Sequence, residues 1–235
     1  MSVAKGIERD TALRMTEIIE QETGGNFPVA ALSGPSHAEE VGRRTPTGCV
    51  AASRDLETAR RVQNVFMAPM FRVYTNEDVV GVELGGALKN VLALCCGACD
   101  GMGLGDNAKA LLMTRGMTEM ARLGVALGGR KETFAGLSGM GDLIVTCTSM
   151  HSRNRRCGIL VGQGKSAQEA MKEVGAVVEG YFAAFSAHQL AEKTGVEMPV
   201  CRCAYDVLYG GQTVRSVLER LMRRDKRHEA DESWI

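Results

Sequence analysis

The feature that most constrains this chain is its longest apolar stretch, which runs from Val79 to Leu104. Its length alone would suit a membrane span. The polar residues within it argue against a span, because burying carboxylate, ammonium and amide groups in lipid is costly. Those residues are Glu83, Lys89, Asn90 and Asp100. We therefore predict no membrane span and expect a buried helix.

The residues before this stretch follow a mixed pattern. Up to residue 76, short apolar strand-like runs alternate with helical patterns, which is typical of an α/β fold. The expected strands are 29–32, 49–52 and 71–74, and the expected helices are 56–66 and 11–22, the latter with Leu13, Ile18 and Ile19 pointing inward. Three strands are few for a freestanding sheet.

From Glu77 onward the strand pattern fades and helical periodicity takes over. The expected helices are 79–99, 107–128, 131–136, 139–148, 153–163, 166–174, 179–194, 199–208 and 213–221, with N-caps at Ser152, Ser166 and Thr213. The closing residues 223–235 carry mixed charges, and we expect them to fray. We accordingly predict an α/β part over 1–76 and an all-helical part over 77–235.

The charge balance and the glycine content indicate which kinds of partner this chain could bind. The chain has 28 basic and 28 acidic residues, so no overall field draws it to nucleic acid or to an anionic membrane. Its 28 glycines and 13 methionines, with only 5% aromatic residues, are typical of helices packed closely around a pocket. We therefore expect a small or locally bound partner.

The eight cysteines lie mostly inside apolar runs of a chain too long to need disulfides, which favours buried thiols and a reducing cytoplasm. Cys96 and Cys99 form a C-x-x-C, but no second pair or nearby histidine completes a zinc site. The four histidines show no metal spacing either, so we predict no metal. The glycine string at 101–107 follows a helix rather than a strand, which excludes a dinucleotide fingerprint there.

Lys89 is the first candidate for chemistry, because it lies in an apolar, glycine-rich helix. Burial disfavours the ammonium and lowers the pKa of a lysine, which suits a general base. The alternative is a lysine whose ammonium reaches solvent from the flank of the helix. Gly85 and Gly86, one turn earlier, favour the first interpretation, since they would clear space for a ligand.

A second group of candidates lies in GLSGMGDLIVTCTSMHSRNRRCG. Asp142 follows a glycine-rich turn, where its carboxylate could hold a substrate hydroxyl or an ammonium, or simply cap a helix. Ser152, Arg153 and Asn154 open the next helix, and free amides with a guanidinium suit a phosphate. The alternative for this RNRR segment is a solvated basic face.

The third group follows the strand in ALSGPSHAEEVG. Gly34 would permit a tight turn, and Ser36 would either contact a ligand or act as a plain N-cap. Lys5 follows a possible strand stub. Because α/β sheets bind ligands at the carboxyl ends of their strands, we expect Lys5 to face the same crevice.

Seven blocks occur in the order and approximate spacing of the bacterial NAD(P)-dependent glycerol-3-phosphate dehydrogenases. They are AKG, LSGPSHAEE, FRVYTNEDVVGVELGGALKNVLA, DGMGLGDNAKALLMTRG, GLSGMGDLIVTCTS, SRNRRCG and VVEGY. The chain resembles that family over nearly its whole length. The resemblance implies part of a Rossmann domain followed by a helical domain like that of 6-phosphogluconate dehydrogenase. It also implies reversible hydride transfer between glycerol 3-phosphate and NAD or NADP, yielding dihydroxyacetone phosphate for glycerophospholipid synthesis.

The same resemblance assigns roles to individual residues. Lys89 matches the family's catalytic proton acceptor. The implied substrate contacts are Lys5, Gly34, Ser36, Lys89, Asp142, Ser152, Arg153 and Asn154, and the implied cofactor contacts are Lys5, Ala38, Arg153, Val177 and Glu179. Helical domains of such dehydrogenases often dimerise, so a homodimer is a further expectation.

One departure from the family concerns the nucleotide-binding half. The family carries G-x-G-x-x-G/A after its first strand, about a hundred residues ahead of AKG, whereas here Met1 falls just before AKG. We therefore expect these residues to lack most of the nucleotide-binding half. We also expect an unpaired edge on the remaining sheet and a poor affinity for the cofactor.

Two other functions remain open at this point. One is a non-catalytic helical module that binds a phosphorylated ligand or dimerises. The other is a 3-hydroxyacid dehydrogenase, whose family typically has Asn four residues beyond the lysine, where this chain has Ala93.

Overall fold

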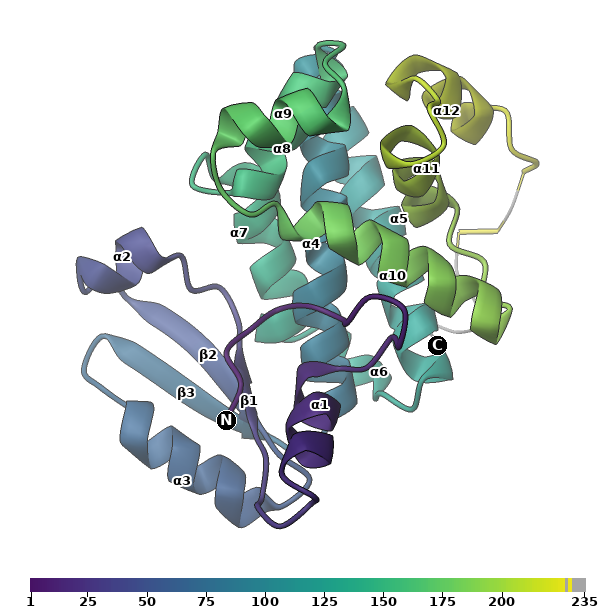
Figure 1. Ribbon diagram of the computed structural model, residues 1–235. Coiled ribbons are helices and arrows are strands. Elements are labelled where there is room, and N and C mark those ends of the chain that lie inside the picture. Colours follow the sequence, from purple (N-terminus) through teal and green to yellow (C-terminus); the bar gives the residue numbers. More distant parts are fainter. Residues whose placement is uncertain (227, 230–235) are drawn as a thin grey trace.

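The computed structural model describes residues 1–226 and 228–229 and shows a small sheet packed against a bundle of helices (Figure 1). The first part comprises α1 (Met15–Glu22), β1 (Ala31–Ser33), α2 (Ala38–Gly42), β2 (Thr47–Ala52), α3 (Leu56–Phe66) and β3 (Phe71–Asn76). The second part comprises α4 (Val79–Gly101), α5 (Gly105–Ala126), α6 (Lys131–Phe134), the π-helix η1 (Leu137–Gly141), α7 (Asp142–Thr148), α8 (Arg153–Gly162), α9 (Ala167–Val174), α10 (Glu179–Thr194), α11 (Pro199–Leu208) and α12 (Val214–Met222).

This order confirms the predicted fold class, an α/β part followed by an all-helical part. The domain boundary between residues 76 and 77 stays a prediction. Ser152, Ser166 and Thr213 are N-caps as predicted, and each accepts a hydrogen bond from a backbone N–H in the first turn of its helix. Within the closing segment, where we predicted fraying, residues 227 and 230–235 lie outside the described residues.

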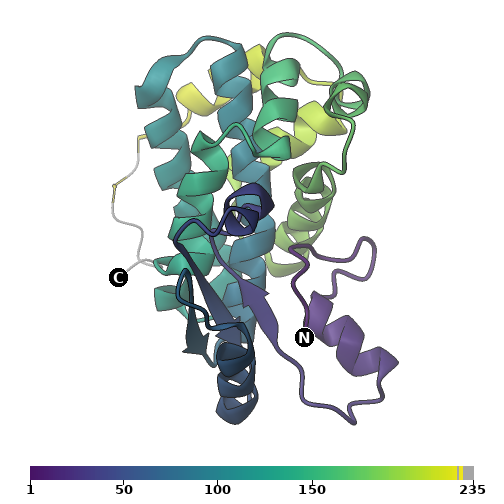
Figure 2. The same cartoon turned by 90° about the vertical axis from the view of Figure 1, so that its left-hand side faces the viewer.

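The sheet has the order β1-β2-β3, with β1 antiparallel to β2 and β2 parallel to β3. One face packs on α4, and the other face packs on α3. Figure 2 shows the sheet and α3 together at one end of the molecule, below most of the helices. The first strand begins at Ala31 rather than Val29, since its pairing with β2 starts at Ala31, and the Val29 carbonyl accepts a hydrogen bond from the Ser53 hydroxyl (2.7 Å).

Helix α4 is the centre of the molecule, with α5, α7, α8 and α10 packed around it (Figure 1). By length and composition it could cross a membrane, but 89% of its most apolar window is buried inside the protein. It is therefore the core helix that the interrupted apolar stretch predicts. Of the eight cysteines, all free, seven are buried and Cys95 is half-buried, which confirms their predicted role as small core side chains.

Glycines let α4 and α8 approach closely. A Cβ atom at Gly97 would overlap the Arg155 carbonyl oxygen, and one at Gly158 would overlap the Leu94 carbonyl oxygen. Gly101 and Gly162 repeat this contact one turn along each helix. Part of the glycine surplus is thus explained by backbone packing between helices, with no room left for a ligand there.

Helix α1 differs from its prediction. It begins at Met15 rather than Thr11, because Asp10 and Ala12 have positive φ angles and Arg14 is the N-cap. The buried residues of this segment are Arg14 and Thr16, whereas the predicted inward residues Leu13, Ile18 and Ile19 are only half-buried. Arg14 Nη1 (2.5 Å) and Thr16 Oγ1 (2.6 Å) both donate to the buried Glu83 carboxylate. An ion pair therefore fixes α1 to α4.

Candidate active site

Three of the predicted site residues meet where the sheet joins the helical part. Lys89 Nζ lies 3.0 Å from Asp142 Oδ1, and Lys5 Nζ lies 2.7 Å from Asp142 Oδ2. The Asp142 and Lys89 side chains are 2% and 7% exposed, and that of Lys5 is 17% exposed. One buried carboxylate therefore holds two amino groups, an arrangement we call the Lys–Asp–Lys cluster.

Each member of the cluster comes from a different element. Lys89 lies in the middle of α4, Asp142 is the first residue of α7, and Lys5 follows the N-terminal residues that pair with β1. The π-helix η1 precedes α7, where we predicted one continuous α-helix over 139–148. Asp142 does not cap α7, because the N-cap is Gly141 and the carboxylate is occupied by the two lysines.

Thr146 completes the surroundings of Lys89. Lys89 Nζ donates to Thr146 Oγ1 (2.7 Å), and Thr146 Oγ1 donates to the Asp142 carbonyl (2.6 Å). Lys89 Nζ thus makes two hydrogen bonds, one to Asp142 and one to Thr146, and no third one within the described residues. The remaining position on this nitrogen is free for another group.

The surroundings of Lys89 shift its pKa. Burial is the largest cause and lowers the pKa of Lys89, and Lys5 lowers it further, whereas Asp142 opposes both. The net direction is downward. The alternative of an ammonium that reaches solvent is wrong, because the side chain is buried.

The turn after β1 brings Gly34 to the same cluster. The Gly34 carbonyl accepts hydrogen bonds from Lys5 Nζ (2.8 Å) and from Ser36 Oγ (3.0 Å). Gly34 has a φ of 141°, and a Cβ atom there would lie 2.9 Å from Cys49 Cα, so only glycine fits this tight turn. Ser36 is not an N-cap, since His37 holds that position before α2 without a side-chain bond.

A second cluster lies beside the first and is linked to it through Asn90. Asn154 Nδ2 donates to Asn90 Oδ1 (2.9 Å), while Asn154 Oδ1 accepts from the Gly180 backbone N–H (2.8 Å). Arg153 and Glu179, at the starts of α8 and α10, form an ion pair of 3.6 Å with both side chains about 40% exposed. The guanidinium therefore remains accessible at the surface.

Two further interpretations of this region need correction. The RNRR segment is no solvated basic face, because Arg155 binds Asp100 (2.7 Å) and so ties α8 to α4. Gly85 and Gly86 clear no space for a ligand, because the Ser138 carbonyl and the Ser33 hydroxyl already fill the positions of their missing side chains. Both glycines serve packing around Lys89 instead.

The remaining predicted residues are less closely tied to the cluster. Ser152 is buried, with 3% of the residue exposed. Its hydroxyl caps α8 by accepting a hydrogen bond from the Arg155 backbone N–H (3.1 Å). Ala38 is exposed at the start of α2, and Val177 is 61% exposed just before α10. The structure thus brings Lys5, Gly34, Ser36, Lys89 and Asp142 together, and places Arg153, Asn154 and Glu179 in the second cluster.

Sequence reasoning missed three residues beside the cluster. Thr146 lies one turn after Asp142, and Asn90 directly follows Lys89, so both could have been found from helical spacing. His37 is the third: its Nε2 is buried without a hydrogen-bond partner in the described part of the chain. Burial and the nearby Lys89 lower the pKa of His37, which favours a neutral ring. A lone histidine after a proline–serine turn carries no sequence signal for this position.

The predicted cofactor residues fit only part of a nicotinamide dinucleotide. The half-exposed Arg153–Glu179 pair offers a donor and an acceptor, and Val177 offers an exposed apolar surface. A pyrophosphate needs a glycine-rich turn between a strand and a helix, and no G-x-G-x-x-G follows a strand in the sequence. The residues present therefore offer no cradle for the pyrophosphate, and only the remainder of the cofactor could contact them.

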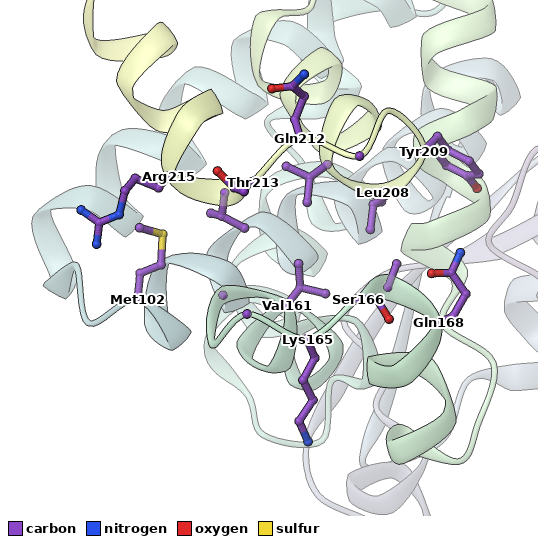
Figure 3. Close-up of a pocket in the computed structure, with 16 residues that line it drawn as sticks. Met102, Val161, Lys165, Ser166, Gln168, Leu208, Tyr209, Gln212, Thr213 and Arg215 are labelled. Atoms are coloured by element: carbon purple, nitrogen blue, oxygen red, sulfur yellow. The ribbon is translucent and has the colours of Figure 1, made fainter.

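A cavity of about 670 Å³ lies elsewhere, between the α8–α9 connection and the α11–α12 connection (Figure 3). It contains Lys165, Ser166, Gln212 and Arg215 but none of the predicted site residues. Met102, on its wall, follows the end of α4, about 20 Å along the helix from Lys89.

A small α/β sheet followed by a helical part, with a buried lysine held by an aspartate where the two meet, is the arrangement of a nicotinamide-dependent dehydrogenase. The comparisons agree. Residues 78–219 match the model of the NAD-dependent glycerol-3-phosphate dehydrogenase C-terminus, and residues 1–59 match that of its N-terminus. The chain belongs to the NAD-dependent glycerol-3-phosphate dehydrogenase family.

Individual relatives support this assignment. The glycerol-3-phosphate dehydrogenase [NAD(P)+] of Clostridium perfringens strain SM101 is 58% identical over 97% of this chain and 69% of its own length. That of Moorella thermoacetica is 57% identical over 98% of this chain and 68% of its own length. The crystal structure of glycerol-3-phosphate dehydrogenase from Coxiella burnetii superimposes with a TM-score of 0.90 at 39% identity, covering 94% of this chain and 68% of that one.

Proposed function

We propose that this chain carries the substrate-binding and catalytic part of an NAD(P)-dependent glycerol-3-phosphate dehydrogenase, which interconverts glycerol 3-phosphate and dihydroxyacetone phosphate. The observation that carries the proposal is the Lys–Asp–Lys cluster, in which Lys89 is buried, depressed in pKa and left with one free position on Nζ. The relatives support the reaction, since their names state it.

Lys89 acts as the proton acceptor. Oxidation of the secondary alcohol removes a hydride from carbon and a proton from oxygen, and a nicotinamide cofactor would supply the hydride acceptor when bound. Because Asp142 and Thr146 each take one N–H of Lys89, the lone pair of the neutral amine is directed away from both of them. The substrate hydroxyl would donate its proton to that lone pair, and the reverse reaction returns the proton to the carbonyl oxygen.

Asp142 and Lys5 position the proton acceptor and balance its charge. When Lys89 takes up a proton, Asp142 Oδ1 at 3.0 Å stabilises the new ammonium. Lys5 is the most exposed member of the cluster, and we propose that it donates to the substrate oxygen and contacts the cofactor. Gly34 and Ser36 bound the same space through the turn after β1 and are proposed substrate contacts.

The second cluster would bind the phosphate. Arg153 has an accessible guanidinium at the start of α8, where backbone N–H groups and the helix dipole favour an anion. Asn154 and Ser152 hold this end of α8 in place and are proposed as substrate contacts beside it. Cofactor contacts are proposed for Lys5, Ala38, Arg153, Val177 and Glu179, with NAD or NADP as the cofactor.

Thermal unfolding with and without glycerol 3-phosphate tests the substrate site without any cofactor. We expect the unfolding temperature to rise by about 5 °C at a hundredfold excess over Kd, and the Arg153→Ala variant to lose that rise. Arg60→Ala, which removes an exposed arginine on α3, is the matched control and should keep it. A rise that persists in Arg153→Ala, or no rise in the parent chain, would contradict the proposed site.

Three broader inferences belong to this proposal. The free, mostly buried thiols support a reducing cytoplasm as the location. The reaction would serve glycerophospholipid synthesis, as the family resemblance implies. The homodimer stays a prediction, and sedimentation of the purified chain would decide it.

A further inference from the structure

The turn after β1 carries a buried polar atom that the fold leaves unused. His37 Nε2 is shielded from solvent and has no hydrogen-bond partner in the described part of the chain. Such atoms are rare in native proteins, because a buried donor or acceptor without a partner is costly. A ligand that supplies the missing partner would recover that cost on binding.

His37 lies near both clusters of the candidate site. Among the charged groups, Lys89 and then Asp142 act most strongly on its ring. The ring centroid of His37 also lies 6.0 Å from that of His151, which directly precedes the N-cap of α8. Arg153 is the first residue of α8. The unused nitrogen therefore belongs to the region in which we propose that the substrate binds.

The His37 ring presents Nε2 as a hydrogen-bond acceptor. Burial is the largest cause that lowers the pKa of His37, and Lys89 lowers it further, so the ring is neutral at about pH 7 and carries one N–H. A hydrogen bond with the Val145 backbone raises the same pKa, which means that the ring donates its N–H to the Val145 carbonyl. Because Nε2 has no partner, the donating atom is Nδ1, and Nε2 keeps its lone pair.

The lone pair on Nε2 requires a donor, and this requirement selects one group of the substrate. Glycerol 3-phosphate has a phosphate, a hydroxyl on its middle carbon and a hydroxyl on its terminal carbon. The phosphate dianion has no proton to donate, and in the proposed function the middle hydroxyl gives its proton to Lys89. The terminal hydroxyl remains. Its carbon is bonded directly to the reacting carbon, so this hydroxyl stays near Lys89, as His37 does.

We propose that His37 determines substrate specificity, and that its Nε2 accepts a hydrogen bond from the terminal hydroxyl of glycerol 3-phosphate. This inference rests on the proposed function, in which Lys89 binds the reacting oxygen and Arg153 binds the phosphate. Dihydroxyacetone phosphate has the same terminal hydroxyl, so the contact persists in both directions of the reaction. A phosphorylated alcohol with a methyl group at that end would leave Nε2 unpaired and would bind more weakly.

Calorimetric titration of this chain with two ligands tests the contact without any cofactor. The ligands are glycerol 3-phosphate and 1,2-propanediol phosphate, which has a methyl group in place of the terminal CH2OH. We expect the chain to bind glycerol 3-phosphate about tenfold more tightly than the analogue, the value of one hydrogen bond. His37→Phe keeps an aromatic ring but removes both nitrogens. It should raise the Kd for glycerol 3-phosphate about tenfold and change the Kd for the analogue by about twofold or less.

Three further variants separate this contact from other causes. His37→Leu removes the same nitrogens with a smaller side chain, and we expect it to abolish the tenfold difference as well. His151→Phe is the matched control, because it makes the same change in the neighbouring ring and should keep the difference. Arg153→Ala should weaken both ligands alike, because both carry the phosphate.

The ratio of the two Kd values decides the proposal, since a structural defect in the site would weaken both ligands alike. Equal affinities of the parent chain for the two ligands would overturn the proposal and leave the proposed function standing. A tenfold difference that persists in His37→Phe and His37→Leu would have the same consequence. Equal weakening of both ligands in these variants would also overturn it, because the ring would then contact the phosphate or only support the turn. If the parent chain binds neither ligand, the proposed function fails and this contact fails with it.

Discussion

Two buried carboxylates in the helical part are held in opposite ways. Asp142, at the start of α7, lies between the amino groups of Lys5 and Lys89. Glu119, in the middle of α5, accepts hydrogen bonds from the backbone N–H groups of Val200 (2.8 Å) and Cys201 (3.1 Å) at the start of α11. The first carboxylate thus holds two amino groups together, whereas the second accepts hydrogen bonds from the free backbone N–H groups at the start of a helix.

The pKa values reflect this difference. Burial raises the pKa of Glu119 to about 7, because backbone N–H groups offset only part of the cost of desolvating a carboxylate. At the Lys–Asp–Lys cluster the group whose pKa shifts is the base, and the pKa of Lys89 is lowered. Burial therefore lowers the pKa of a lysine in one region and raises the pKa of a carboxyl group in the other.

Lys89→Met should produce the largest effect, a loss of kcat. It would show whether the region around Asp142 differs in function from the region around Glu119. Loss of a positioned proton acceptor typically costs a factor of 10² to 10⁴ in kcat. The measurement is kcat for glycerol 3-phosphate oxidation by a fusion that joins this chain to the nucleotide-binding segment of the Clostridium perfringens relative. Glu119→Gln is the control and should leave kcat within about twofold at neutral pH. Equal losses in both variants would show that the effect on kcat comes from folding rather than chemistry.

Asp142→Asn should have the next largest effect. It leaves the amino groups of Lys5 and Lys89 facing a neutral amide, and removing one partner of a buried pair costs about 3 to 5 kcal/mol. Urea unfolding at pH 7 measures this loss in the free energy of unfolding. The isosteric Glu119→Gln variant serves as the comparison, because no amino group there loses its carboxylate. A loss below about 1 kcal/mol for Asp142→Asn would contradict the role given to the ion pairs.

Glu119→Gln should remove a pH-dependent contribution of about 1 to 3 kcal/mol to the free energy of unfolding. The pKa of Glu119 in the folded state, about 7, lies above its ordinary value of 4.5, so folding favours the protonated form. That contribution is complete below pH 4.5 and is lost as the pH rises through 7. The parent chain should therefore lose stability relative to Glu119→Gln between pH 5 and pH 8, as measured by urea unfolding. A constant difference over that range would refute the raised pKa.

Ser36→Ala should have the smallest effect, about 1 kcal/mol or less on the free energy of unfolding. The Ser36 hydroxyl donates to the Gly34 carbonyl, and Lys5 Nζ still donates to that oxygen in the variant. If Ser36 also contacts the substrate, the Kd for glycerol 3-phosphate should rise while the unfolding temperature stays almost constant. A loss as large as that for Asp142→Asn would mean that the turn, rather than the ion pairs, holds the cluster together.

Much of the helical part could be predicted from the sequence. Helix lengths follow from the spacing of apolar residues, and Ser152, Ser166 and Thr213 mark helix starts because their hydroxyls accept bonds from free N–H groups. The start of α1 could not be predicted in this way. It depends on the buried Glu83, which Arg14 and Thr16 reach from a distant part of the chain.

The candidate site, too, could be predicted only in part. Its residue types could be read from the sequence, because an apolar helix with an internal lysine and a glycine turn with an aspartate are local features. That Asp142 holds an ammonium was one of the alternatives that the sequence left open. The sequence could not decide among them, since Lys89 and Asp142 lie far apart in the chain.

The sequence by itself determined the order of elements, the buried character of α4 and the identity of the residues available for chemistry, because these depend on local spacing and side-chain type. Only the tertiary structure decided that Asp142 binds two lysines and that Gly85 and Gly86 serve packing. Those properties arise from groups distant in sequence, whose desolvation and contacts are set only when the chain has folded.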